Sequence, residues 1–142
     1  MTELPGRVLG VDLGTVRIGL ALSDPLRLTA QPFGRVERKA VRADLAPLLE
    51  ITRAREVSAV VVGHPLLLSG GAGEGARDAE AFAERLKPVV GCPVHLWDER
   101  LTTVQATRAL IEGNVRRARR REVVDAAAAA LMLQSWLDSQ PR

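Results

Sequence analysis

The sequence predicts an α/β domain, because strand-like and helix-like segments alternate along it after an opening section of strands alone. Short apolar runs bounded by Gly or Pro predict the strands, and apolar residues repeating every three or four positions predict the helices. The predicted order is β-β-β-α-β-α-β-α-α. The chain has 142 residues, close to the commonest domain size, so we expect a single domain over residues 1–142.

The opening section predicts a hairpin followed by a third strand. Arg7 to Leu13 is an apolar run, and Arg17 to Ser23 is its expected hairpin partner after the turn around Gly14-Thr15-Val16. Pro32 to Glu37 is the third candidate strand.

A helix and a buried strand are expected next. Asp44 to Ala54 has a helical pattern, with Asp44 as a plausible cap and with Pro47 tolerated because it falls within the first turn. Val57 to Val62 is a β-branched run, which is typical of a strand buried on both faces.

The following segment is a loop and then a helix. Gly63-His64-Pro65 follows the buried strand, and Ser69 to Gly75 contains four Gly. Its own side chains cannot hold such a loop, so we expect it to be mobile. The next helix is predicted from about Glu74 to Lys87.

The last part predicts one strand and two helices. Pro93 to Trp97 is the strand, and Thr102-Thr103-Val104-Gln105 fits a capping box that begins a helix running to about Glu112. Gly113-Asn114 ends that helix. The final helix is predicted to begin near Glu122 and to run to about Asp138.

Basic residues are concentrated just before the final helix. The net charge is +3, and all but two of the 20 basic residues are Arg, which codon bias in a GC-rich genome would also produce. Five Arg stand close together without an acid in the expected connection, namely Arg116, Arg117, Arg119, Arg120 and Arg121. They form either a solvated loop or a binding segment for a polyanion. Because aromatic residues are few, we expect the protein to recognise the nucleic-acid backbone rather than to stack on bases.

The sequence shows no sign of export or of a membrane partner. The single Cys92 cannot form an internal disulfide, and Met1 to Gly10 has no basic-then-apolar leader. No run of about 18 apolar residues is present. We therefore expect a soluble, cytoplasmic protein.

Three acids lie at the edges of apolar segments. Asp12 follows Val8 to Val11, Glu99 follows the strand that ends at Trp97, and Asp125 opens a run of five Ala. Open α/β sheets place their sites at the carboxyl ends of strands, and small Ala side chains let a helix pack closely on a sheet. If folding gathers these acids, they form a set of hard oxygen ligands suited to Mg²⁺ or Mn²⁺.

Each acid also has a simpler explanation. Asp12 could be a turn residue before Gly14, and Glu99 could pair with Arg100 on the surface. Asp125 could be an acid in the first turn of a helix, which the helix dipole favours. A shared cation would explain all three together, because clustered carboxylates repel one another without one.

Four motifs carry a resemblance to the YqgF family. They are Gly10-Val11-Asp12-Leu13-Gly14-Thr15 with Arg17-Ile18-Gly19, Val61-Val62-Gly63-His64-Pro65-Leu66, Asp98-Glu99-Arg100-Leu101-Thr102-Thr103, and Val124-Asp125-Ala126-Ala127-Ala128. That family comprises bacterial ribonuclease H-like proteins described as pre-16S rRNA nucleases or as Holliday junction resolvases. The resemblance runs from about Arg7 to Leu137. It implies a ribonuclease H-like fold with a mixed five-stranded sheet, whose first three strands are antiparallel, flanked by helices.

The resemblance also implies roles for particular residues. Asp12, Glu99 and Asp125 take the catalytic, metal-binding positions, with Asp12 bridging the metals, and Asp98 is a weaker candidate because neighbouring strand residues face opposite ways. The implied phosphate contacts beside the site are Arg17, Arg100 and Thr102. His64 replaces a usually apolar residue and is either a structural loop histidine or an extra proton-transfer or phosphate group, whereas mid-strand His95 is expected to be structural.

The expected function is a Mg²⁺- or Mn²⁺-dependent nuclease that acts on structured nucleic acid and trims the 5′ end of pre-16S rRNA. The substrate alternatives are branched or single-stranded DNA. Asp12-Leu13-Gly14-Thr15 also resembles the first phosphate loop of sugar kinases and actin-like ATPases, but 142 residues leave no room for their second lobe. A non-catalytic nucleic-acid-binding module is the remaining alternative, and retention of all three acids disfavours it.

Overall fold

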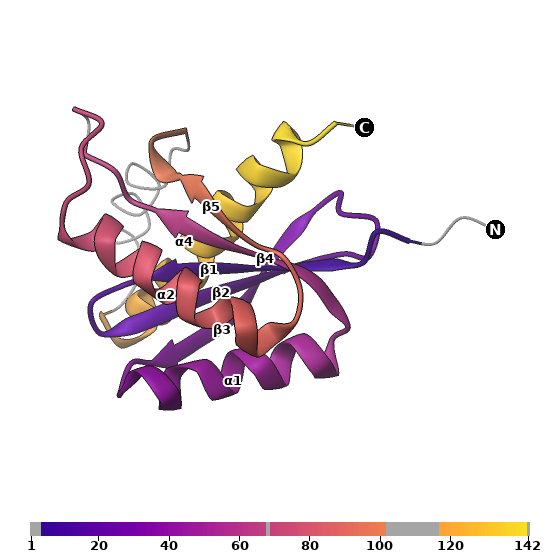
Figure 1. Ribbon diagram of the computed structural model, residues 1–142, viewed down its shortest axis with the longest axis horizontal. Helices are drawn as coiled ribbons and strands as arrows, with labels where there is room; N and C mark the ends of the chain where they lie inside the picture. Colours follow the sequence, from indigo (N-terminus) through magenta and orange to yellow (C-terminus); the bar gives the residue numbers. More distant parts are fainter. Residues whose placement is uncertain (1–3, 68, 102–116, 142) are drawn as a thin grey trace.

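The computed structural model describes residues 4–67, 69–101 and 117–141, which form a mixed five-stranded sheet with helices on both faces (Figure 1). The strands are β1 (Arg7–Leu13), β2 (Arg17–Ser23), β3 (Ala30–Glu37), β4 (Val57–His64) and β5 (Val94–Asp98). The helices are α1 (Val41–Ala54), α2 (Glu74–Val90), the 3₁₀ turn η1 (Glu99–Leu101) and α4 (Arg117–Ser139).

The strand order across the sheet is β3-β2-β1-β4-β5. β2 pairs antiparallel with β1 and with β3, whereas β1–β4 and β4–β5 are parallel. The first three strands are therefore antiparallel, as predicted. The carboxyl ends of β1, β3, β4 and β5 lie at the same end of the sheet, because these four strands run in the same direction. We call this end the carboxyl edge.

The two faces of the sheet carry different helices because strand residues alternate between them. Leu9 and Val11 of β1 pack in a core with α1 and α2, whereas Val8 packs in a second core with α4. Figure 1 shows α1 and α2 in front of the sheet and α4 behind it. None of the helices in the described part of the chain is long and apolar enough to cross a membrane.

The first helix begins earlier than the sequence predicted. α1 starts at Val41 with Ala40 as its N-cap, so the prediction of Asp44 as the cap is wrong. The Asp44 side chain instead points back from inside the helix, and its carboxylate accepts a hydrogen bond from the backbone N–H of Lys39 at 2.7 Å. Pro47 accordingly lies beyond the first turn, where its missing N–H leaves a helix carbonyl without its usual donor.

The final helix also begins earlier than predicted, at Arg117 rather than near Glu122. The backbone of residues 117–121 is therefore helical, and the prediction that these Arg occupy a connection is wrong for them. Arg is a good helix former, so a run of Arg extends a helix as readily as it forms a loop. The helix predicted from Thr102 to Glu112 lies outside the described residues, and the mobility of the loop from Ser69 to Gly75 stays a prediction.

α4 packs unusually close to β1. A Cβ added to Gly10 would lie 2.9 Å from Cβ of Leu133 and 3.4 Å from the carbonyl oxygen of Ala129, so no side chain fits there. Leu133 is fully buried at this contact. The missing side chain of Gly10 therefore sets the distance between the helix and the sheet.

We expect Gly10→Ala to lower the free energy of unfolding by about 1–3 kcal/mol, because an added methyl group in a tight contact forces backbone or side-chain shifts. Urea unfolding followed by circular dichroism measures the change. Gly71→Ala is the control, since among the described residues its added Cβ would meet Oγ of Ser69 alone, at 3.7 Å, and should change the stability by less than about 0.5 kcal/mol. Equal stability of the two variants would contradict a packing role for Gly10.

Candidate functional site

Asp12 lies near the end of β1, on the face that α4 covers, and only 7% of it is exposed. Strand pairing aligns it with Gly19 on β2, and the parallel pairing of Val11 with Val62 brings the next residue of β4, Gly63, beside it. The same registers extend this line of residues to both edge strands. We call it the Asp12 row, and from β3 to β5 it consists of Arg35, Gly19, Asp12, Gly63 and Trp97.

The two glycines of the Asp12 row make room for the other two acids. The backbone oxygen of Asp125 occupies the space that a Cβ on Gly19 would need. A Cβ on Gly63 would lie 2.7 Å from Oε1 of Glu99. Asp12 therefore lies between Gly19, which the backbone of Asp125 covers, and Gly63, which the Glu99 carboxylate covers.

Three different elements deliver these acids to the carboxyl edge. Asp12 belongs to β1, Glu99 begins η1 directly after β5, and Asp125 lies in α4 as that helix reaches the sheet. Figure 1 shows the first turns of α4 at the same end of the sheet as the arrowhead of β4. The fold thus brings the three predicted acids into adjoining positions.

The side chains of Asp12, Glu99 and Asp125 are not arranged as a complete set of metal ligands. Among the described residues, no three His, Cys, Asp or Glu side chains are arranged as a group that could hold a metal ion. Carboxylates at close range repel one another when no cation lies between them, by roughly 4 kcal/mol per pair at 4 Å in a medium of dielectric constant about 20. The donor chemistry fits a hard divalent cation, and side-chain rotation would be needed to complete the ligand set.

Asp98 and Arg100 form a pair beside Glu99. Nε of Arg100 donates to the Asp98 carboxylate at 3.0 Å and Nη2 donates at 2.7 Å. These hydrogen bonds lower the pKa of Asp98 and raise the pKa of the Arg100 guanidinium. Nη1 of Arg100 also donates to the Leu67 carbonyl at 3.4 Å, so this residue links η1 to the segment after β4. The Asp98 carboxylate is therefore paired with the Arg100 guanidinium, which agrees with its being the weaker candidate for a metal ligand.

Arg17 lies on the α4 face of β2, two residues before Gly19. Its side chain is 22% exposed, and its Nε lies 3.4 Å from Oε1 of Glu37. It thus lies on the same face of β2 as Gly19, and its predicted phosphate contact stays a prediction.

The two histidines lie in structural contacts. Nε2 of His64 lies 3.2 Å from Oε1 of Glu80 in α2, on the face of the sheet opposite Asp12. The His95 ring stacks on Trp136, with 5.4 Å between the ring centroids. These contacts favour the structural interpretation of both residues.

The remaining predicted contacts are only partly described. Thr102 and Arg116 lie outside the described residues. The described backbone places Arg117, Arg119, Arg120 and Arg121 in the first turns of α4, which extend from Asp125 by about 1.5 Å per residue. Whether their side chains bind nucleic acid stays a prediction.

Sequence reasoning missed Arg35. This half-buried residue belongs to the Asp12 row, and its Nη1 atom is buried without a hydrogen-bond partner among the described residues. The alternation of residues along β3 places Arg35 on one face of the strand. Only the register between β2 and β3 shows that this face carries it into the Asp12 row.

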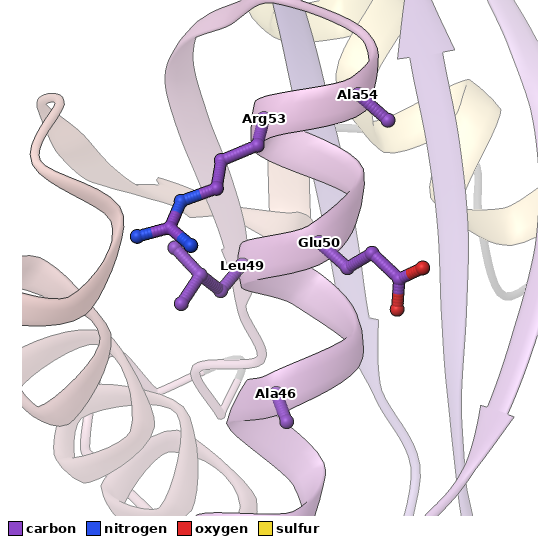
Figure 2. Close-up of a pocket in the computed structure, with 5 residues that line it drawn as sticks. All are labelled: Ala46, Leu49, Glu50, Arg53 and Ala54. Carbon is purple, nitrogen blue, oxygen red and sulfur yellow. The ribbon is translucent and has the colours of Figure 1, made fainter.

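A hollow on the outer side of α1 is unrelated to these residues. Figure 2 shows its lining side chains along a single helix, and they are Ala46, Leu49, Glu50, Arg53 and Ala54. Because α1 covers the face of the sheet opposite α4, this hollow is remote from the Asp12 row.

Comparison with known sequences gives matches over nearly the whole chain. The family model of RuvX, described as Holliday junction resolvase, matches residues 6–139. A Myxococcus xanthus protein named "Putative pre-16S rRNA nuclease" is 50% identical over 133 residues, which cover 94% of this chain and 88% of the relative. A Moorella thermoacetica protein with the same name is 48% identical over 93% of this chain and 94% of the relative.

Comparison with solved structures confirms the expected ribonuclease H-like fold. Thermus thermophilus RuvC in complex with a Holliday junction substrate matches with a TM-score of 0.59 at 18% identity, over 94% of this chain and 95% of that chain. Fowlpox virus resolvase in complex with Holliday junction DNA matches with a TM-score of 0.54 at 10% identity, over 94% of this chain and 97% of that chain. At these identities the likeness concerns the fold alone.

We expect Gly63→Ala to weaken Mn²⁺ binding by about 10–100-fold, the usual cost of disturbing groups that orient metal ligands. The added Cβ would displace the Glu99 carboxylate, while the flexibility of this side chain should preserve the fold. Isothermal titration calorimetry with Mn²⁺ measures the affinity, with Gly71→Ala as the control. An affinity equal to that of the unmodified protein would remove Glu99 from the ligand set.

Proposed function

This chain belongs to the RuvX family, which the motif resemblance identified as YqgF, and on that premise we propose that it is a metal-dependent nuclease. It hydrolyses phosphodiester bonds in structured nucleic acid, working as one ribonuclease H-like domain. The observation that carries the proposal is the arrangement around Asp12, in which Asp125 covers Gly19 and the Glu99 carboxylate covers Gly63.

The proposed substrate is precursor 16S rRNA, cut at its 5′ end. The relatives at 50% and 48% identity that are named as pre-16S rRNA nucleases support this choice. A substrate of this kind implies that the protein acts in the cytoplasm.

Asp12, Glu99 and Asp125 would hold Mg²⁺ or Mn²⁺, with Asp12 as the shared ligand. The two glycines of the Asp12 row support this assignment, because no side-chain carbon at Gly19 or Gly63 separates Asp12 from the other two acids. A divalent ion bound there would supply a water of lowered pKa and a positive charge for the leaving oxygen.

Basic residues would position the sugar-phosphate backbone across this edge. Arg17 and Arg100 flank the acids on two sides, and Thr102 follows η1 in the sequence. The Arg-bearing start of α4, Arg117 to Arg121, precedes Asp125 along the helix and would contact more distant phosphates. These contacts orient the strand without reading its sequence.

Cleavage of branched DNA is the second candidate function, because the matching family is described as Holliday junction resolvase. A symmetric junction would require two copies of the site related by a two-fold axis. A substrate panel therefore separates this function from rRNA processing.

We expect Asp12→Asn to lower cleavage of labelled precursor 16S rRNA at least about a hundredfold while leaving its binding intact, because the amide removes a charge from the metal site. Cleavage is measured with Mg²⁺, Mn²⁺ or EDTA on the rRNA, on a four-way DNA junction and on single strands. Glu84→Gln is the matched control, since Glu84 pairs with Lys87 on the exposed surface of α2. Undiminished cutting by Asp12→Asn would refute the assigned site, and preferential cutting of the junction would favour the second function.

We expect the triple change of Arg119, Arg120 and Arg121 to Ala to weaken binding and to flatten its salt dependence. Losing three phosphate contacts lowers the slope of log K against log salt by about 2–2.7. Fluorescence anisotropy over a salt series measures the slope, and Mn²⁺ affinity should not change. A slope equal to that of the unmodified protein would exclude this segment from the substrate path.

A further inference from the structure

Arg35 extends the Asp12 row on the side of Asp125. It pairs with Gly19 across β2 and β3, so it points to the face of the sheet that α4 covers. β3 and β1 are the two strands that pair with β2, so Arg35 lies two strand spacings, about 10 Å, from Asp12. The backbone of Asp125 lies over Gly19, between these two residues.

The hydrogen-bonding capacity of Arg35 is not satisfied within the described residues. Its Nη1 atom is buried and has no hydrogen-bond partner there. Buried donors are nearly always paired, and guanidinium groups favour the oxygens of carboxylate and phosphate. An unpaired donor of this kind at the edge of a proposed site indicates a partner that arrives with the substrate.

Among the residues whose side chains the structure describes, no carboxylate pairs with Arg35. Arg17 and Glu37 lie on the same face and are paired across β2 and β3, and Nε of Arg17 lies 3.4 Å from Oε1 of Glu37. Glu37 is therefore within ion-pair distance of Arg17, and its side chain is 53% exposed. Nε of Arg17 is, like Nη1 of Arg35, buried without a hydrogen-bond partner among the described residues. Asp12 and Asp125 are the acids that would bind the proposed cation. Besides these two acids, Arg17, Arg35 and Glu37 are the charged residues of β2 and β3 on this face.

We propose that Arg35 binds a phosphate of the substrate strand within about three nucleotides of the cut, a distance set by its separation from Asp12 and by the spacing of phosphates along a strand. The inference rests on the proposed function, because the cut is placed at the three acids. Arg35 fixes the path of the strand over β2 and β3, and Arg17 contacts it between Arg35 and the cut.

Binding is tested in the cleavage-inactive Asp12→Asn background with a labelled RNA that carries the 5′ precursor segment of 16S rRNA. Adding Arg35→Ala should weaken binding about tenfold and lower the salt slope by about 0.7–0.9, the value of one phosphate contact. Arg35→Lys should keep the slope and recover only part of the affinity, since it retains the charge without the planar fork. Arg85→Ala is the control, because Arg85 is exposed on α2 across the sheet and should change neither quantity.

The contacted phosphate is located by replacing single phosphates near the cut with uncharged methylphosphonates. One replacement should weaken binding when Arg35 is present and have no further effect with Arg35→Ala, because both changes remove the same contact. Additive losses at every phosphate would overturn the proposal.

Thermal unfolding separates substrate binding from a structural role. Removing an unpaired buried donor should leave the unfolding temperature unchanged or raise it. A lowered unfolding temperature with Arg35→Ala, together with an unchanged salt slope, would show that Arg35 serves the fold and would overturn the proposal.

The two proposals can fail independently. If no nucleic acid is cut but Arg35→Ala still lowers the salt slope and abolishes the effect of one methylphosphonate, the nuclease function fails and the phosphate contact stands. If Asp12→Asn abolishes cutting but Arg35→Ala behaves like Arg85→Ala, the nuclease function stands and the inference about Arg35 fails.

Discussion

The contact between α4 and the glycines of the sheet is the constraint on which the rest of the site depends. Gly10 admits Leu133 and Ala129, and Gly19 admits the backbone of Asp125, so the helix lies directly on β1 and β2. A side chain at either position would hold the helix away from the sheet. The depth of this packing sets the position of the Asp125 backbone over Gly19, the neighbour of Asp12 on β2.

Contacts on the face of the sheet opposite Asp12 support the strands that carry the candidate site. On the α1 and α2 face, Arg38 donates to the Gly14 carbonyl at 2.9 Å and to the Asp78 carboxylate at 2.6 Å, and this pairing raises the pKa of the Arg38 guanidinium. The contact ties the turn between β1 and β2 to α2. It therefore supports the hairpin that presents Asp12 and Gly19 to the other face.

The charges at the carboxyl edge fall into two groups with different partners. Asp98 and Arg100 satisfy each other within the chain, and Arg38 is paired with Asp78. The Asp12 row, in contrast, includes Arg35, whose buried Nη1 donor has no hydrogen-bond partner among the described residues. An unpaired guanidinium donor of this kind favours the oxygens of a polyanion as its partner.

The sequence by itself predicted the described strands and helices, the antiparallel opening strands and the three acids that the fold places near one another, because apolar periodicity and short motifs are local properties. The catalytic role of these acids stays a prediction. The sequence-based prediction misplaced the starts of α1 and α4, since the Lys39 contact of Asp44 and the continuation of a helix through Arg117 depend on surroundings that local patterns do not encode. Only the tertiary structure decided that Gly19 and Gly63 flank Asp12 and that Arg35 joins their row. Strand register and helix packing depth set those neighbours, and both arise from contacts between residues far apart in the chain.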